Sequence, residues 1–424
     1  MSKYIVNSSE EQQEMLDELG CASFAELFRK AGVLGAPQLS IPEGVTEFEA
    51  YRDMAALAAE NHVFKHVFRG AGSYKHFIPS AVKNIVSRNE FVTAYTPYQA
   101  EVSQGILQGI FEYQSMMCEL TGMDVSNASE YDGGTAAAEA VMMCVDRKHH
   151  KILLSRGINP EYRKVVHTYH QFSDSIEIEE FGTDFEVDSN TAGVFVQYPD
   201  FFGNIPDLVK IKEKAGDAKL VVIANPTALG LLEAPGKLGA DIVVGEGQQL
   251  GMPMSFGGPY LGFMCAKEKL VRQLPGRIVG QTVDKDGKTC YTLTLQAREQ
   301  HIRREKASSS ICSNEALCAF TAAVYLAAVG PKGLYDVADT SFQLAHYLAD
   351  RLNEIGLSVV NKGEFFNEFV TECPIDSKEL MKHLYEKDIL GGLLLSNNRI
   401  LWCATEVNTK EEIDWLVDVI REVL

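Results

Sequence analysis

The chain of 424 residues lacks several features that mark specialised classes of protein. It has no run of about 18 or more apolar residues, so no membrane span is expected. Its N-terminus, MSKYIVNSSEEQQEML, has neither the basic start nor the apolar stretch of a signal peptide. Its nine cysteines form no C-x-x-C pair. Reduced thiols in a cytoplasmic protein are therefore expected.

Positive charge is also scarce. Lys and Arg number 39 against 58 Asp and Glu, which gives a net charge of −19. A surface this acidic repels phosphate backbones, so nucleic acid is not expected as a partner. Metal ligands are few, because His149–His150 and the pair His167 and His170 have no third ligand nearby. No metal site is predicted.

A lysine is missing where one class of enzymes needs it. Residues 239–251 read GADIVVGEGQQLG, a buried strand running into a loop. In a large class of pyridoxal-phosphate enzymes such a loop carries the lysine that holds the cofactor. Here no lysine occurs between Lys237 and Lys267, and the loop offers Gln248 and Gln249 instead.

The middle of the chain alternates short apolar runs with helical patterns, which predicts a parallel sheet covered on both faces. The predicted strands are residues 151–154, 193–198, 220–224 and 242–245. Residues 260–266 form one further strand, for which an antiparallel direction is considered. The helices between them are residues 161–167 and 208–215. Ligands of such sheets bind at the carboxyl ends of the strands. Three loops there stand out: residues 197–199, 225–227 and 245–251.

A glycine-rich turn precedes another predicted helix. Gly133, Gly134 and Thr135 open the helix that runs to Val145. Free backbone N–H groups and the helix dipole at such a start favour an anion. The alternative is a simple turn, since glycine is the standard residue wherever the chain bends tightly.

Two further segments carry candidate function. In Tyr95-Thr96-Pro97-Tyr98 the proline biases Thr96 away from helix, so an extended loop is expected before a helix over 103–120. Residues 298–306, which include Arg303, Arg304 and Lys306, form a basic cluster in an acidic protein. This cluster is either a solvated helix with i,i+4 ion pairs or a cradle for an anionic group or acidic partner.

Five motifs together closely resemble the P-protein family of the glycine cleavage system, the glycine decarboxylases. They are YTPYQAEVSQG (95–105), DGGTAAAEA (132–140), PMSFGGP (253–259), LPGR (274–277) and residues 298–306. The motifs occur in family order over most of the first 320 residues. The N-terminal helices and the C-terminal segment fit the family less distinctively.

The resemblance implies an α/β fold of the pyridoxal-phosphate transferase type (fold type I), with a mostly parallel sheet. The pattern of predicted elements divides the chain into three parts. Residues 1–65 would be a helical arm that packs on the body or a partner. Residues 66–330 would be the large domain with a degenerate cofactor site. Beyond a boundary at Pro331-Lys332-Gly333, residues 331–424 would be a small α+β domain. Its predicted elements are a long helix over 335–355, strands at 357–360, 365–372 and 399–405, and a last helix.

P-proteins exist as one long chain or as two paired chains, and this chain resembles subunit 1 of the two-chain form. The resemblance implies that subunit 2 supplies the lysine and binds pyridoxal phosphate, with two copies of each subunit. Glycine would be decarboxylated, and its aminomethyl group passed to the lipoyl group of the H-protein. Asn225 stands where an aspartate usually holds the pyridine nitrogen protonated, which agrees with a lost cofactor site.

The resemblance further implies that Tyr95, Thr96, Pro97 and Tyr98 complete the partner's active site, whereas interface packing alone is the other reading. Gly133, Gly134, Thr135, Asn225, Gln248 and Gln249 would form the vestigial cofactor site. Two alternatives stay open. One is an inactive scaffold or regulatory subunit, and the other is a free-standing pyridoxal-phosphate lyase or transferase that uses an unusual lysine, Lys237 or Lys306.

Overall fold

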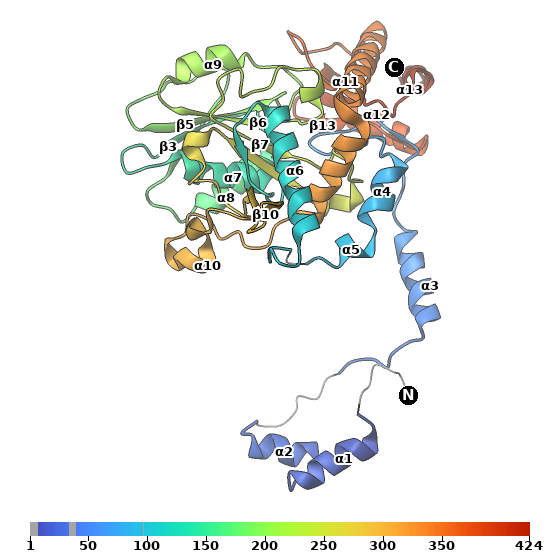
Figure 1. Cartoon of the computed structure of the whole chain (residues 1–424). Helices are drawn as coiled ribbons and strands as arrows, with labels where there is room; N and C mark the ends of the chain where they lie inside the picture. Colours follow the sequence, from blue (N-terminus) through green and yellow to red (C-terminus); the bar gives the residue numbers. More distant parts are fainter. Residues whose placement is uncertain (1–6, 34–39, 96) are drawn as a thin grey trace. The chain divides into compact units, whose positions relative to one another are not determined.

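The computed structural model describes residues 7–33, 40–95 and 97–424, and it divides the chain into two compact units, residues 1–63 and 64–424. The first unit contains the helices α1 (Ser9–Glu18), α2 (Phe24–Lys30) and α3 (Glu47–Ala58) (Figure 1). Capping boxes at Ser8 and Thr46 begin α1 and α3. The predicted helical character of this segment is confirmed. Its packing on the body or a partner stays a prediction.

The second unit is built on a seven-stranded sheet. The strands, in spatial order, are β2 (Val125–Ser126), β8 (Gly262–Ala266), β7 (Ile242–Glu246), β6 (Lys219–Ala224), β5 (Thr191–Tyr198), β3 (Lys151–Ser155) and β4 (Glu177–Phe181). Neighbours from β7 to β4 pair in parallel, and β8 is antiparallel to both β2 and β7. The mostly parallel sheet and the antiparallel strand near 260–266 are therefore confirmed.

Helices cover both faces of this sheet, as the fully apolar strands predict (Figure 1). The helices α7 (Gly133–Cys144) and α8 (Pro160–His170) share one core with Val221 and Ile223 of β6. The side chains between these two on β6, such as Val222, point to the opposite face of the sheet. There they pack in a second core with α6 (Gln104–Thr121) and the first part of α11 (Ala316–Glu354). This alternation follows from the two-residue period of a strand.

The long helix α11 differs from the prediction of a helix that begins near Tyr335. It starts at Ala316 and is interrupted at Gly330 (φ 64°, ψ 178°). Pro331 then restarts it, because proline fits the first turn of a helix. Among the described residues, α11 alone is long and apolar enough to meet a length-and-composition test for a membrane span. Core helices pass the same test, and the first part of α11 packs against α6.

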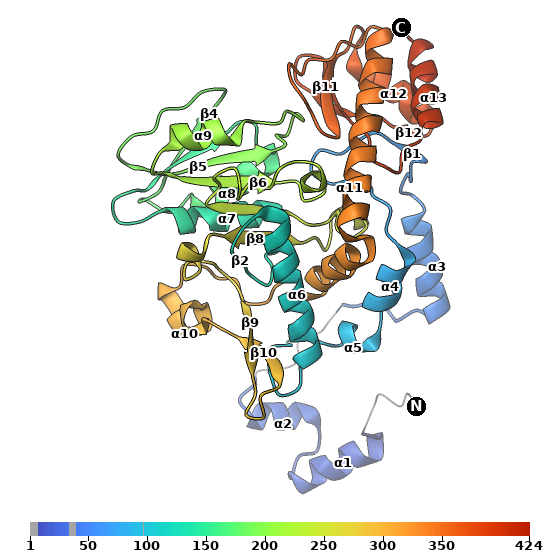
Figure 2. The ribbon, with the colours of Figure 1, turned by 45° about the horizontal axis from the view of Figure 1, so that its top comes forward.

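The C-terminal part has its own small sheet and core (Figure 2). The sheet order is β11 (Glu368–Glu372), β14 (Arg399–Cys403), β13 (Leu393–Leu395), all antiparallel, and Trp402 lies fully buried in it. The helices α12 (Ser377–Glu386) and α13 (Lys410–Arg421) accompany it. The strand predicted at 357–360 is confirmed only in part. The segment forms an isolated antiparallel bridge, Val359 to Thr371, and the Val360 N–H donates to the Val370 carbonyl.

Several short elements complete this unit. They are β1 (His66–Val67) paired with β12 (Ile389–Leu390), the hairpin β9 (Val279–Val283) and β10 (Thr289–Leu293), and the helices α4 (Ser80–Val86), α5 (Asn89–Val92), α9 (Leu208–Ala215) and α10 (Gln300–Arg303).

Candidate functional site

The carboxyl ends of β5, β6 and β7 meet at one edge of the sheet, as the strand-end rule predicts. Between them lies a cavity of only about 30 Å³, room for roughly two water molecules. It is lined by Gly72, Tyr74, Asn159, Tyr162, Gln197, Ala224, Asn225, Glu246 and Gln249. The chain's own side chains therefore fill most of the space where a ligand of this fold would sit.

The start of α7 lies beside this cavity, and the N–H groups of Asp132, Gly133 and Thr135 already have acceptors within the chain. Asp132 Oδ1 accepts the Thr135 N–H at 2.8 Å, and the Thr135 hydroxyl accepts the Asp132 N–H. The Gly133 N–H donates to Glu246 Oε2 at 3.0 Å. A Cβ on Gly133 would lie 2.9 Å from both Glu246 N and the Tyr162 hydroxyl, so glycine is required by this close approach. At the helix start predicted as a vestigial anion site, the carboxylates of Glu246 and Asp132 therefore accept the N–H groups of Gly133 and Thr135.

The other residues of the predicted vestigial site also bind their own chain. The Asn225 Oδ1 atom accepts the N–H groups of Thr227 (3.0 Å) and Ala228 (3.1 Å), which fixes the turn after β6. Gln248 is fully buried, and its Nε2 donates to the Met252 carbonyl at 2.7 Å. Gln249 is buried beside it, and its Oε1 has no hydrogen-bond partner in the described parts of the chain.

Neither lysine considered as an unusual cofactor ligand lines this cavity. Lys237 lies on the surface, where its Nζ pairs with Glu233 Oε1 at 3.0 Å. Lys306 is exposed after α10. Nothing in the described residues places an amine at the end of β7.

A second cluster brings three of the sequence motifs together. The Tyr98 hydroxyl donates to Asn314 Oδ1, and the Arg277 guanidinium lies over the Tyr98 ring, 5.0 Å from its centroid. Arg277 also pairs with the buried carboxylate of Glu299. Arg298 donates to the Leu274 carbonyl. The motifs at 95–105, 274–277 and 298–306, far apart in sequence, thus meet around Tyr98.

Burial shifts the titration of this cluster. It raises the pKa of Tyr98 to about 12, so the phenol is a proton donor at neutral pH. It lowers the pKa of Arg298 to about 10 and raises the pKa of the fully buried Glu130 well above its usual value. Buried polar atoms without a hydrogen-bond partner in the described structure concentrate here: Asn127 Oδ1, Ser129 Oγ, Glu130 Oε2, Arg277 Nε, Arg298 Nε and Nη2, Glu299 Oε1 and Asn314 Nδ2. Such groups call for water or a partner's polar groups.

The Tyr95 loop presents one phenol outward from this cluster. Tyr95 is 84% exposed, whereas Pro97 is buried and Tyr98 half-buried. Thr96, the fourth predicted contributor, lies outside the described residues. The loop therefore has a fixed base at Tyr98 and an exposed side chain three residues earlier.

The basic cluster at 298–306 divides into two parts. Arg298 and Glu299 turn inward, while Arg303, Arg304 and Lys306 are exposed on α10 and the turn after it. The i,i+4 ion pairs of the first reading do not form for these three exposed cations in the described structure. Their role as a contact for an acidic partner stays a prediction.

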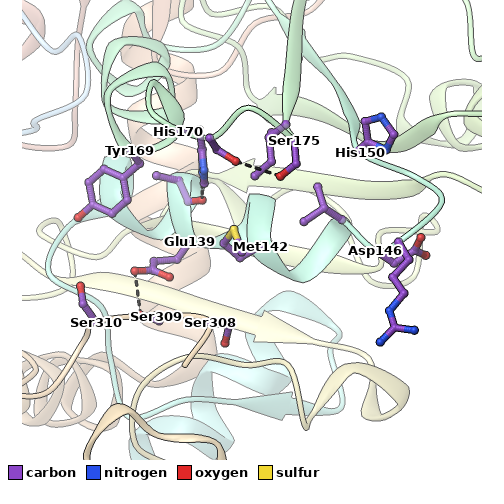
Figure 3. Close-up of a pocket in the computed structure, with 15 residues that line it drawn as sticks. Glu139, Met142, Asp146, His150, Tyr169, His170, Ser175, Ser308, Ser309 and Ser310 are labelled. Atoms are coloured by element: carbon purple, nitrogen blue, oxygen red, sulfur yellow. Dashed lines mark hydrogen bonds between the residues drawn. The ribbon is translucent and has the colours of Figure 1, made fainter. Parts of the chain in front are cut away.

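A larger cavity, about 850 Å³, lies along the middle of α7 rather than at its start (Figure 3). Glu139 and Met142 of α7, Tyr169 and His170 of α8, and the Ser308–Ser310 segment surround it. Glu139 accepts a hydrogen bond from Ser309 at 2.8 Å. None of the predicted site residues lines this cavity.

Comparison with known proteins places this geometry in a class. The fold is that of pyridoxal-phosphate-dependent enzymes of fold type I, and a Burkholderia pseudomallei sphingosine-1-phosphate lyase matches it with a TM-score of 0.64 at 14% identity, over 93% of this chain and 94% of that one. The model of the glycine cleavage system P-protein family matches residues 2–420. The chain belongs to this family.

Individual members of this family are similar to the chain over its whole length. A probable glycine dehydrogenase (decarboxylating) subunit 1 of Thermotoga maritima is 47% identical, and one of Moorella thermoacetica is 48% identical, each over 99% of both chains. A crystal structure of glycine decarboxylase (P-protein) of the glycine cleavage system, in inhibitor-bound form, superposes with a TM-score of 0.92 at 41% identity, covering 100% of both chains. The resemblance seen in the sequence motifs is confirmed.

The cofactor of this enzyme class does not fit the corresponding place in this chain. The cavity is too small, Glu246 accepts the Gly133 N–H at the start of α7, and no lysine of residues 7–33, 40–95 or 97–424 lines the cavity. Sequence reasoning found the glycines and the missing lysine but passed over Glu246. The signal was visible, because an acid at the end of an otherwise apolar strand, between Gly245 and Gly247, is unusual for a buried position.

Proposed function

We propose that this chain is the subunit of a glycine decarboxylase that holds no cofactor itself and completes an active site on a second subunit. Membership of the P-protein family makes glycine decarboxylation in the glycine cleavage system its function. The observation that carries the division of labour is the Glu246 carboxylate at the start of α7, in a strand-end site without lysine.

In this proposal the second subunit binds pyridoxal phosphate on its lysine, and the cofactor there supplies the electron sink for loss of carbon dioxide. Two copies of each subunit, glycine as the substrate, a lipoylated H-protein as acceptor of the aminomethyl group and a cytoplasmic location belong to the proposal. So does the division into residues 1–65, 66–330 and 331–424.

The contribution of this chain to the reaction is the loop Tyr95, Thr96, Pro97 and Tyr98. Tyr98 is held by Asn314 and by the stacked Arg277, so the base of the loop is fixed. Tyr95 projects into solvent and presents a phenol that can order a small polar substrate in the neighbouring subunit. Preorganised donors of this kind stabilise charge as it develops.

The test uses Tyr95→Phe, Tyr98→Phe and the double variant in the complex reconstituted with subunit 2. Loss of a phenol that orders substrate should lower glycine–bicarbonate exchange about 10- to 100-fold. Tyr335→Phe is the control, because that tyrosine is exposed on α11 away from the loop. Wild-type exchange in all three variants would refute the site role and leave the scaffold alternative.

A separate experiment tests where the cofactor resides. The chain purified alone and mixed with pyridoxal phosphate should show no borohydride-reducible absorbance, whereas the complex should. A stable reducible adduct on this chain would overturn the proposal in favour of the free-standing enzyme.

A further inference from the structure

Glu246 is the last residue of β7, and its carboxylate collects three backbone donors from three segments. Oε2 accepts the Gly133 N–H at 3.0 Å, and Oε1 accepts the N–H groups of Gln248 and Leu261, each at 2.9 Å. The residue is 7% exposed, and no ion pair reaches it within the described chain. A buried carboxylate held only by backbone N–H groups is bound in the way that proteins bind a small oxyanion.

The position of this carboxylate is the one that a phosphate would need. The first N–H groups of a helix have no partner within the helix, and its dipole favours negative charge there. At α7 the Glu246 side chain takes the Gly133 N–H, and the Asp132 side chain takes that of Thr135. A phosphate at this helix end would have to displace Glu246 and would lie beside Asp132.

The same carboxylate begins a hydrogen-bonded path to the C-terminal part. Gln248, whose N–H it accepts, exchanges two bonds of 3.1 Å with the backbone of Tyr74. The Tyr74 hydroxyl donates to Glu368 Oε2 on β11 at 2.6 Å. Side chains of the chain itself thus join the large sheet to the small one across the place where a cofactor would sit.

We propose that Glu246 is a built-in anion that occupies the phosphate position at the start of α7. This chain consequently does not bind phosphate esters there. Small oxyanions such as formate or phosphate bind this place only when the Glu246 carboxylate is removed. The ligand class that fits this place is therefore a small oxyanion with one or two negative charges, and in the wild-type chain the Glu246 side chain stands in for it.

The test is chemical rescue of Glu246→Ala in the full chain assembled with subunit 2, at pH 8.5, where the Glu246 carboxylate of the wild type is ionised. The variant leaves three buried N–H groups without an acceptor, which should lower Tm by about 3 to 6 °C. Amide exchange in the first turn of α7 should become about tenfold faster. Sodium formate, and more weakly phosphate, should restore both values in a saturable way, whereas sodium chloride at equal ionic strength should not.

Glu139→Ala is the matched control. Glu139 is also a buried acid of α7, but it accepts from the Ser309 side chain rather than from a set of backbone donors. Formate should not rescue it. Glu246→Gln is the second variant, to be used if Glu246→Ala does not fold. Its carboxamide fills the same volume, so it should lose stability without gaining any response to formate.

Three results would overturn the inference. Glu246→Ala could be as stable as the wild type, formate could stabilise the wild type equally, or it could rescue Glu139→Ala to the same extent. Neither readout depends on catalysis, so failure here is distinguishable from failure of the role proposed for Tyr95 and Tyr98.

Discussion

The hydrogen bond between Tyr74 and Glu368 makes a prediction whose sign depends on pH. Both side chains are buried, and the phenol donates to Glu368 Oε2 at 2.6 Å while Oε1 accepts the Ala71 N–H at 2.6 Å. Burial raises the pKa of Glu368 to about 7, and it raises the pKa of Tyr74 well above its usual value. The tyrosine therefore stays a donor, while Glu368 changes charge near neutrality.

Tyr74→Phe removes this donor and leaves the shape nearly unchanged. A hydrogen bond to a charged group contributes about 1.5 to 3 kcal/mol, and one to a neutral group about 0.5 to 1.5 kcal/mol. The variant should therefore lose about 2 to 3 kcal/mol at pH 8.5, where Glu368 is ionised, and about 1 kcal/mol at pH 5.5. The difference corresponds to a further rise of about one unit in the pKa of Glu368.

The direction follows from linkage. The pKa of Glu368 is raised in the folded protein, so its contribution to stability is full below its ordinary pKa and is lost as pH rises through about 7. Without Tyr74 the loss continues to higher pH, so the gap between variant and wild type opens above pH 7.

Urea unfolding at pH 5.5, 7 and 8.5 measures this gap, with the exposed Tyr335→Phe as the control. A gap that does not change with pH, or that is larger at pH 5.5, would refute the reasoning.

Three further outcomes are expected. Burial raises the pKa of Glu246 to about 7, so wild-type stability should fall as pH rises from about 4.5 through 7, and E246Q should flatten that slope in a urea series. Gly203→Ala should lower the free energy of unfolding by about 3 kcal/mol or more, because the new Cβ would lie 1.9 Å from the Glu368 carbonyl oxygen. Gly287 has a similar positive φ but lies in open space, so Gly287→Ala should lower it by only about 1 kcal/mol in the same urea series. Asp241→Asn should lower the free energy of unfolding by about 2 kcal/mol at pH 7 and by progressively less below pH 4. Burial raises the pKa of Asp241, but hydrogen bonds from Lys212 and Lys269 outweigh burial and lower this pKa to about 2.

Much of the sheet could be predicted from the sequence, because its strands are buried on both faces and read as unbroken apolar runs. The predicted helix at 208–215 matches α9. The hairpin of β9 and β10 was not predicted, although Asp286-Gly287 is a turn signal, because its strands are half polar and show no strong period. The boundary predicted at Pro331-Lys332-Gly333 lies next to a real break at Gly330, but the sequence signal could not show that another helix ends there.

The candidate site was less accessible to sequence reasoning, for a geometric reason. The residues that close α7 come from segments 113 positions apart, Gly133 and Glu246. The strand-end rule predicts that both lie at one edge of the sheet, but it does not say which acid reaches the helix. Likewise, the motif around Tyr98 was visible, but its contacts with Arg277 and Asn314 depend on the packing of three separate loops.

Losing a cofactor from a fold of this kind would leave a void and a helix end with free N–H groups, and both would destabilise the chain. Glu246 and Gln249 offset part of these costs, since both line what is left of the space and Glu246 accepts the Gly133 N–H. A site closed in this way no longer changes shape with the cofactor. The Tyr98 cluster still contains unpaired buried polar atoms in the described structure, so these atoms can bind water or the polar groups of a partner. Under the proposed role of the Tyr95 loop, selection for chemistry should act on that loop, and selection for stability on Glu246.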